Sequence, residues 1–161
     1  MTQQTIDIKL QSQGQPIAPS AKIQRLHLFV GKWNTEGKTH ASADIPAVKV
    51  AFVDTYEWLA GKFFLVHRAS GQIGNEELNT IEFIGYDALI QKYACYCFDS
   101  RGNADLLQAD FHGPMWTIEG KSSRFTGMFE TSGHTLTGQW EQSIDGVNWL
   151  PWMDIKSTKV L

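Results

Sequence analysis

The hydrophobic positions of the chain fall into short runs that are separated by residues typical of turns. After Gly31 no run keeps the spacing of a helix, whereas β-branched and aromatic residues recur about every dozen residues, between Gly, Asn, Asp and Ser. This pattern predicts strands. Their expected ranges are Lys32–Lys38, Val48–Leu59, Lys62–Ser70, Asn79–Ala88, Lys92–Asp99, Asp105–Phe111, Met115–Glu119, Arg124–Thr131, Thr135–Gln142 and Trp149–Thr158.

Short turn signals connect these strands. Ala60-Gly61 and Asp145-Gly146 are typical of tight hairpins, and Arg101–Asn103 and Ser132–His134 contain residues that tolerate positive φ. Strands joined by short turns pair antiparallel with their chain neighbours, and a sheet of about ten strands without covering helices removes its edges by closing. We therefore predict an all-β fold, a single antiparallel up-and-down barrel.

The N-terminal region follows a different pattern. Residues 1–19 are rich in Gln and Ser, include two prolines and keep no periodicity, which predicts a flexible arm. From Ser20, a residue type that caps helices, a short apolar stripe runs to Gly31. We expect one or two helical turns that close the barrel, and one barrel domain over residues 20–161.

The order of several short motifs resembles a known family. Gly31-Lys32-Trp33 after a short helix is similar to the start of the lipocalin and fatty-acid-binding (calycin) barrels. The further motifs are Trp58–Phe64, Ile84–Asp87, Tyr93, Asp99-Ser100 and Ser143–Trp149. Together they resemble a bacterial domain-of-unknown-function family with a lipocalin-like barrel. In lipocalins a basic residue of the last strand packs over the first-strand Trp, which makes Lys156 and Lys159 the two candidates for Trp33.

Composition limits the partners and the location. Fourteen Lys and Arg against seventeen Asp and Glu give a formal charge of -3, so no general positive field attracts nucleic acid or anionic lipid. The longest purely apolar run is Phe63–Val66, and the first twenty residues lack the apolar segment of a secretory signal. We predict a soluble, cytoplasmic protein that binds neither nucleic acid nor membranes. Cys95 and Cys97 share one face of a strand, which favours reduced thiols.

The interior of the barrel is the candidate binding site. Side chains fill the interior of such a barrel only in part, and alternation along each strand selects the inward positions. Most of the selected side chains are aromatic. The predicted ligand-binding residues are Phe52, Tyr56, Trp58, Arg68, Tyr86, Tyr96, Trp116, Arg124, Met128, Trp140 and Trp152.

Two arginines shape the ligand hypothesis. An interior guanidinium needs a partner, and for Arg68 and Arg124 this is either a carboxylate such as Asp54 or Glu130, or the acidic group of a ligand. The resemblance to fatty-acid-binding barrels, which use internal arginines in this way, keeps the second option open. We therefore predict that the barrel binds a small apolar or weakly acidic organic molecule.

Two other functions stay open. An enzyme of the isomerase, cyclase or decarboxylase type would combine an interior tyrosine with a carboxylate or histidine. Its candidate groups are Tyr56, Tyr86, Tyr96, Asp54, Glu130 and His67. An interaction module without ligand would form a homodimer through edge strands or the N-terminal arm. The chain has no serine elbow, phosphate loop, dinucleotide fingerprint or metal-ligand spacing, so we predict neither a metal nor another cofactor.

Overall fold

Ten strands follow a short helical segment in the computed structural model, which describes residues 18–161. The helical segment consists of α1 (Ala21–Arg25) and the 3-10 helix η1 (Leu26–Phe29). The strands are β1 (Gly31–Thr39), β2 (Lys49–Trp58), β3 (Phe64–Ile73), β4 (Glu76–Asp87), β5 (Lys92–Asp99), β6 (Ala104–His112), β7 (Met115–Glu119), β8 (Ser123–Phe129), β9 (Thr135–Gln142) and β10 (Leu150–Lys159). A flexible arm was predicted for residues 1–19. Of this arm, residues 1–17 lie outside the described part of the chain.

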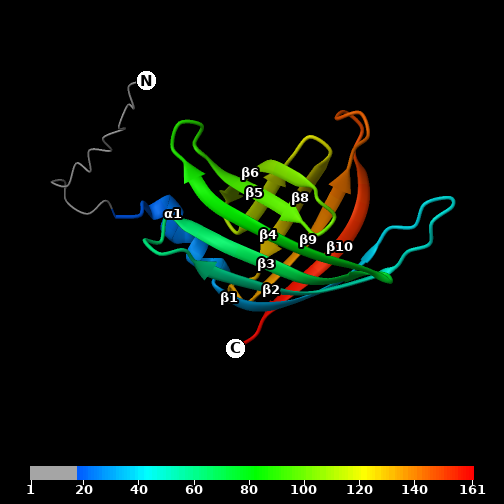
Figure 1. Cartoon of the computed structure of the whole chain (residues 1–161), viewed down its shortest axis with the longest axis horizontal. Helices are drawn as coiled ribbons and strands as arrows, with labels where there is room; N and C mark the ends of the chain where they lie inside the picture. Colours follow the sequence, from blue (N-terminus) through cyan, green and yellow to red (C-terminus); the bar gives the residue numbers. More distant parts are fainter. Residues whose placement is uncertain (1–17) are drawn as a thin grey trace, which may run out of the picture.

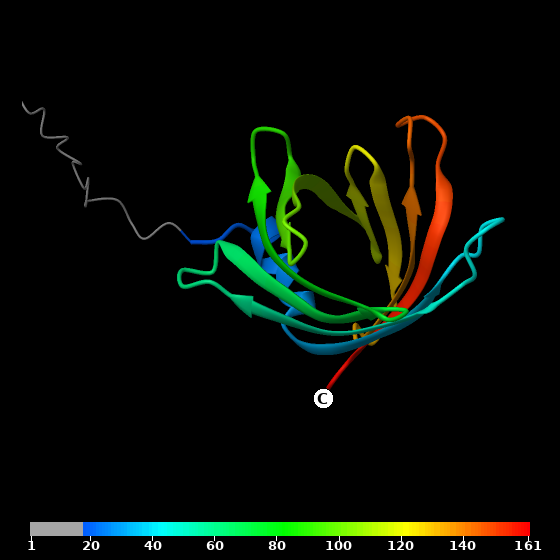
Figure 2. The ribbon, with the colours of Figure 1, turned by 45° about the vertical axis from the view of Figure 1, so that its right-hand side comes forward.

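The sheet closes into a barrel. Each strand pairs antiparallel with its chain neighbours, and β1 also pairs with β10, where Trp33 is opposite Lys159. Figure 1 shows the strands around one interior, with α1 at one end, and Figure 2 shows the β1–β2 loop (cyan) at the end away from the helix. The predicted antiparallel up-and-down barrel with a short N-terminal helix is confirmed.

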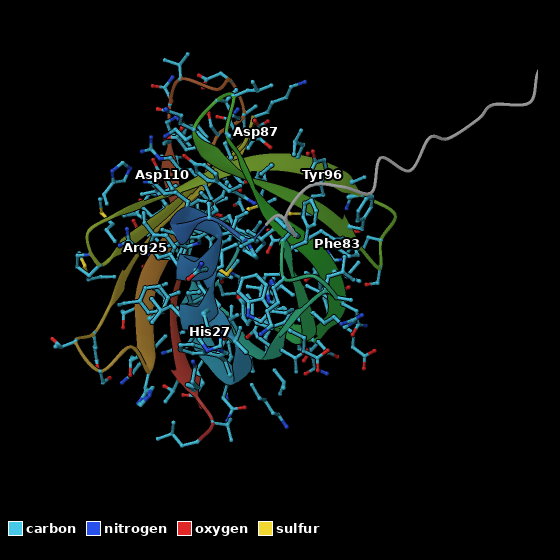
Figure 3. All side chains as sticks on the ribbon, turned by 90° about the vertical axis from the view of Figure 1, so that its left-hand side faces the viewer. Arg25, His27, Phe83, Asp87, Tyr96 and Asp110 are labelled. Carbon is cyan, nitrogen blue, oxygen red and sulfur yellow. The ribbon has the colours of Figure 1, made fainter. Side chains whose placement is uncertain are left out.

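The helical segment closes one end of the barrel. Ser20 caps α1, and Leu26 and Phe29 are buried against the interior. The Tyr93 hydroxyl donates a hydrogen bond to the Lys22 carbonyl at 2.7 Å, which attaches β5 to α1. Figure 3 looks onto this end and shows the helical segment lying across it. Within residues 18–161 no helix is long and apolar enough to cross a membrane.

Trp33 forms part of the floor at this closed end. Its side chain is buried, and its Nε1 donates a hydrogen bond to the Phe29 carbonyl at 2.6 Å. Lys159 Nζ lies 4.9 Å from the centroid of the Trp33 ring and donates to the Leu28 carbonyl at 3.0 Å. Of the two candidate lysines, Lys159 therefore packs over the tryptophan, and Lys156 does not.

Candidate functional site

The barrel holds a cavity of about 320 Å³ that is lined by side chains from all ten strands. Phe29 and Trp116 contribute to its wall near the closed end. Toward the opposite end the lining residues are only partly buried, among them Phe52, Leu78 and Trp152. Small-molecule pockets usually measure about 300–1,000 Å³, so the cavity has room for a small ligand.

Six polar side chains form a hydrogen-bonded belt on one side of this cavity. They come from neighbouring strands of the closed sheet, from β10 through β1 to β5. We call them the polar belt: Ser157, Thr35, Asp54, His67, Glu82 and Cys97. Strand pairing explains their proximity, because Glu82 lies directly opposite both His67 and Cys97, and paired residues of antiparallel strands share one face.

His67 is the centre of the polar belt. Its Nε2 lies 2.9 Å from Asp54 Oδ1, and its Nδ1 lies 3.0 Å from Glu82 Oε2. The other carboxylate oxygens also accept hydrogen bonds, from the Thr35 hydroxyl at 2.6 Å and the Cys97 thiol at 3.0 Å. A single imidazole donates to both carboxylates only when both of its nitrogens carry protons, that is, as an imidazolium between two ionised carboxylates.

The charges of the belt are mutually stabilising. Burial alone would lower the pKa of His67, but the hydrogen bonds and the negative charges of Asp54 and Glu82 raise it to about 9. Burial alone would raise the pKa of Glu82, yet the hydrogen bond and the positive charge of His67 hold it below its usual value. Two carboxylates and one imidazolium leave the belt with one net negative charge.

Tyr56 lies between the belt and the closed end. Its ring stacks on that of His67, with centroids 4.0 Å apart and planes at 3°, and its other neighbour is Phe29 at 5.3 Å. Within residues 18–161 its hydroxyl makes no hydrogen bond, although every fully buried side-chain polar atom there has a partner. The hydroxyl oxygen therefore retains some accessible surface, and the Tyr56 side chain lines the cavity. Burial, followed by the negative charges of Asp54 and Glu82, raises the pKa of Tyr56, so the hydroxyl stays protonated.

Apart from Ser123 on β8, the opposite side of the cavity is apolar. Its side chains come from β6 to β10. They include Leu107, Ile118, Phe125, Leu136, Trp140 and Ile155. The rings of Phe125 and Trp140 pack with their centroids 5.1 Å apart. A ligand in the cavity would thus meet hydrogen-bonding groups on one side and hydrophobic surface on the other.

Most of the sequence-predicted site residues face the interior. Those that line the cavity are Phe52, Tyr56, Trp116, Trp140 and Trp152. Trp152 reaches it beside Met153, because a shift in the pairing of β10 between Pro151 and Met153 interrupts the alternation. Trp58 and Tyr86 instead pack against the core. Ligand binding by these residues stays a prediction.

The predicted inward orientation is wrong for Arg68 and Arg124. Arg68 lies on the outer surface, where its guanidinium is 3.8 Å from the Glu57 carboxylate. Phe63–Val66 is uninterrupted apolar sequence without a period of two, so the pairing of Tyr56 with His67 decides which side chains of β3 point inward.

The orientation of Arg124 follows from that of the adjacent Phe125. Because Phe125 is buried in the core, Arg124 points outward, where it forms two hydrogen bonds to Glu141, the shorter at 2.7 Å. Its guanidinium also lies 4.5 Å from the centroid of a Trp149 ring. Neither arginine therefore offers a positive charge to the cavity.

Tyr96 and Met128 also point outward, contrary to prediction. The inner positions of β5 belong to Tyr93, Cys95 and Cys97, which leaves Tyr96 exposed on the outside (Figure 3). On β8 the buried Phe125 and Phe129 leave Met128 on the outer face. The prediction selected the larger side chains of β5, whereas the barrel places the small thiols inside.

Sequence reasoning missed the assembly of the belt. Tyr56, Asp54 and His67 were each candidates, but only strand pairing brings them together. Glu82 was not proposed, although the inward positions of Ile84 and Tyr86 on the same strand would have identified it by alternation. Glu130, the other predicted carboxylate, is exposed. In the described part of the chain no group of three or more His, Cys, Asp or Glu side chains is arranged to hold a metal ion.

Comparison with known proteins relates the chain to a family and to several solved structures. The model of the family described as "Protein of unknown function (DUF1579)" matches residues 18–145. The crystal structure of Rv2717c from M. tuberculosis is similar with a TM-score of 0.64, at 9% sequence identity, over 89% of this chain and 99% of that chain. That likeness supports the barrel fold and nothing finer. No curated protein matches the sequence.

Proposed function

Since the chain belongs to the DUF1579 family of proteins of unknown function, we propose a function from its site: the barrel binds a small, mainly apolar organic molecule in its interior. The observation that carries this proposal is a cavity of about 320 Å³ with one hydrophobic side and one hydrogen-bonding side. Ligand sites commonly combine an apolar lining with a few polar groups that orient the ligand.

The proposed ligand has no acidic group. A weakly acidic ligand was expected from two interior arginines, and both arginines lie on the outer surface. Within the described chain no Lys or Arg side chain lines the cavity. Asp54 and Glu82 would repel a ligand carboxylate in this poorly hydrated space, since like charges interact strongly at low dielectric constant.

The polar belt favours binding over catalysis. A general acid or base must present its proton or lone pair to the substrate. Both His67 nitrogens are hydrogen-bonded to carboxylates, so the imidazolium has no proton directed at the cavity. The Tyr56 hydroxyl has a raised pKa, so it stays protonated and is a weak acid, which suits it to orienting a bound molecule by hydrogen bonding.

A cavity-filling variant tests the proposed function. The neutral fluorophore N-phenyl-1-naphthylamine should bind saturably to the wild-type protein. Ala69 lines the cavity, whereas the next residue, Ser70, is exposed, so Ala69→Phe should weaken binding at least about tenfold and Ser70→Phe should not. Fluorescence titration measures both affinities, and circular dichroism confirms that the variants fold. Equal affinities for the two variants would place the fluorophore outside the cavity and contradict the proposal.

A further inference from the structure

The charge in the cavity is unbalanced. Asp54, His67 and Glu82 are mostly buried, with side chains 12%, 14% and 13% exposed, so each retains some access to the cavity space. With His67 between the two carboxylates, its raised pKa and the lowered pKa of Glu82 accompany an arrangement of two carboxylates and one imidazolium. One negative charge therefore lacks a positive partner within the belt.

No cation elsewhere in the described chain supplies that partner. The cavity lining contains neither Lys nor Arg. Arg68 and Arg124 pair with carboxylates on the outer surface, and Lys159 is bound to the Leu28 carbonyl at the closed end. An uncompensated charge in a poorly hydrated space is costly, and a ligand of opposite charge would offset that cost.

The belt also has capacity for further hydrogen bonds. Each oxygen of Asp54 and Glu82 accepts one hydrogen bond within the belt, whereas a carboxylate oxygen has two lone pairs. The Tyr56 hydroxyl oxygen is another accessible acceptor beside them. An ammonium group has three donors and no acceptor, so it matches this set of groups better than an alcohol or a carboxylate does.

We propose that the natural ligand is an organic cation, a small amine whose ammonium group lies against Asp54 and Glu82 and whose apolar body packs on the Phe125–Trp140 side of the cavity. This inference rests on the proposed function and adds the class of ligand. The aromatic rings of the cavity suit such a molecule, since they attract both cations and flat hydrocarbon groups.

Three probes of similar size and different charge test the class of ligand. They are 2-phenylethylamine, 2-phenylethanol and phenylacetate, which are cationic, neutral and anionic near neutral pH. Isothermal titration calorimetry at low salt measures the affinity of each for the full chain. We expect the amine to bind at least about tenfold more tightly than the alcohol, because hydrogen bonds to charged groups are roughly twice as strong as neutral ones, and the carboxylate to bind most weakly.

A pair of Glu→Gln substitutions locates the source of this preference. Glu82→Gln removes the excess charge of the belt, so the preference for the amine over the alcohol should fall about tenfold while the alcohol affinity changes little. Glu141→Gln is the matched control, because that carboxylate pairs with Arg124 on the outer surface, and it should keep the wild-type preference. If Glu82→Gln does not fold, the three-probe comparison on the wild-type protein still decides the question.

The outcomes separate this inference from the proposed function. Binding of the amine and the alcohol with equal affinity, or tightest binding of the carboxylate, would overturn the cation inference and leave the proposed function intact. Binding of the neutral fluorophore without any binding of the amine would do the same. If neither the fluorophore nor any of the three probes binds, both proposals are wrong.

Discussion

The two ends of the barrel are built from the same alternating strands, but they are filled differently. Around α1 and η1 the interior is packed with buried aromatic rings. These are Phe29, Trp33, Tyr93, Phe111, Trp116 and Phe129. Toward the other end, Phe52 and Trp152 are only partly buried and border a cavity. The comparison indicates that tight aromatic packing is concentrated at the closed end, whereas the opposite end borders the cavity in which we propose that a ligand binds.

The polar belt lies between these two regions. On one side Tyr56 connects it to the aromatic cluster through Phe29, and on the other side it meets the cavity. Its hydrogen bonds join six strands around one side of the barrel. The belt therefore serves both regions, because it satisfies buried polar groups for folding and provides the charged surface that a ligand would meet.

Removal of one phenyl ring from each end should give the largest difference in the free energy of unfolding. Phe29→Ala should lower the free energy of unfolding by about 3–5 kcal/mol, because its ring packs against four aromatic neighbours. Phe52→Ala, the matched substitution toward the opposite end, should cost about 1 kcal/mol or less, since its side chain is only partly buried. Urea denaturation measures both. Equal losses would show that stability is not concentrated at the closed end.

The pH dependence of stability tests the belt. The pKa of His67 is about 9 in the folded protein and 6.5 without these contacts, so folding favours its protonated form. The corresponding stabilisation is fully present below pH 6.5 and is lost as the pH rises through 9. The free energy of unfolding should therefore fall by about 1 kcal/mol from about pH 6.5 to about pH 7.5, a range that lies below the pKa of about 8.5 of an unfolded cysteine.

Two histidine variants distinguish the contribution of His67 in the belt from that of an exposed histidine. Urea titrations of His67→Gln should lose this pH dependence, although the variant is less stable because two buried carboxylates lose their shared cation. His40→Gln is the control, since His40 pairs with Asp154 where both side chains are well exposed, and it should keep the wild-type profile. A profile that stays unchanged in His67→Gln would show that the belt is not its source.

The fold was predictable because its signals are local. Strand runs, turn residues and the helix cap at Ser20 each act within a few residues, and short connections leave little choice of topology. Gly31-Lys32-Trp33 placed the start of β1 and the tryptophan of the floor. The choice between Lys156 and Lys159 needed the register, in which Trp33 is opposite Lys159.

The site was only partly predictable because orientation depends on pairing between strands. Where aromatic residues share one face of a strand, as Phe52, Tyr56 and Trp58 do in β2, the inward side was predicted correctly. In β3 an uninterrupted apolar run hides the alternation, and in β5 the small thiols lie inside. A shift of one residue moves every side chain of a strand to the other face. For this reason the prediction placed Arg68 inside the barrel, where the structure has His67.

A smaller effect is expected from the lysine that covers the floor. Lys159→Met removes the cation over Trp33 and the hydrogen bond to the Leu28 carbonyl, and should lower the free energy of unfolding by about 1 kcal/mol. Lys156→Met, on the same strand, contacts neither group and should change stability by less than about 0.5 kcal/mol. Urea denaturation of both variants measures the difference. Equal changes in the free energy of unfolding would show that Lys159 does not stabilise the closed end.

The smallest effect is expected at Arg68, and it tests the orientation of β3 directly. Because Arg68 forms only an exposed ion pair with Glu57, Arg68→Ala should change the free energy of unfolding by less than about 0.5 kcal/mol. It should also leave the affinity for N-phenyl-1-naphthylamine unchanged, whereas Ala69→Phe, one residue further along the strand, should weaken it. If Arg68→Ala instead impairs binding as strongly as Ala69→Phe, Arg68 faces the cavity and His67 does not. The polar belt, its net negative charge and the preference for a cation would then lose their structural basis together, because all three depend on this one register.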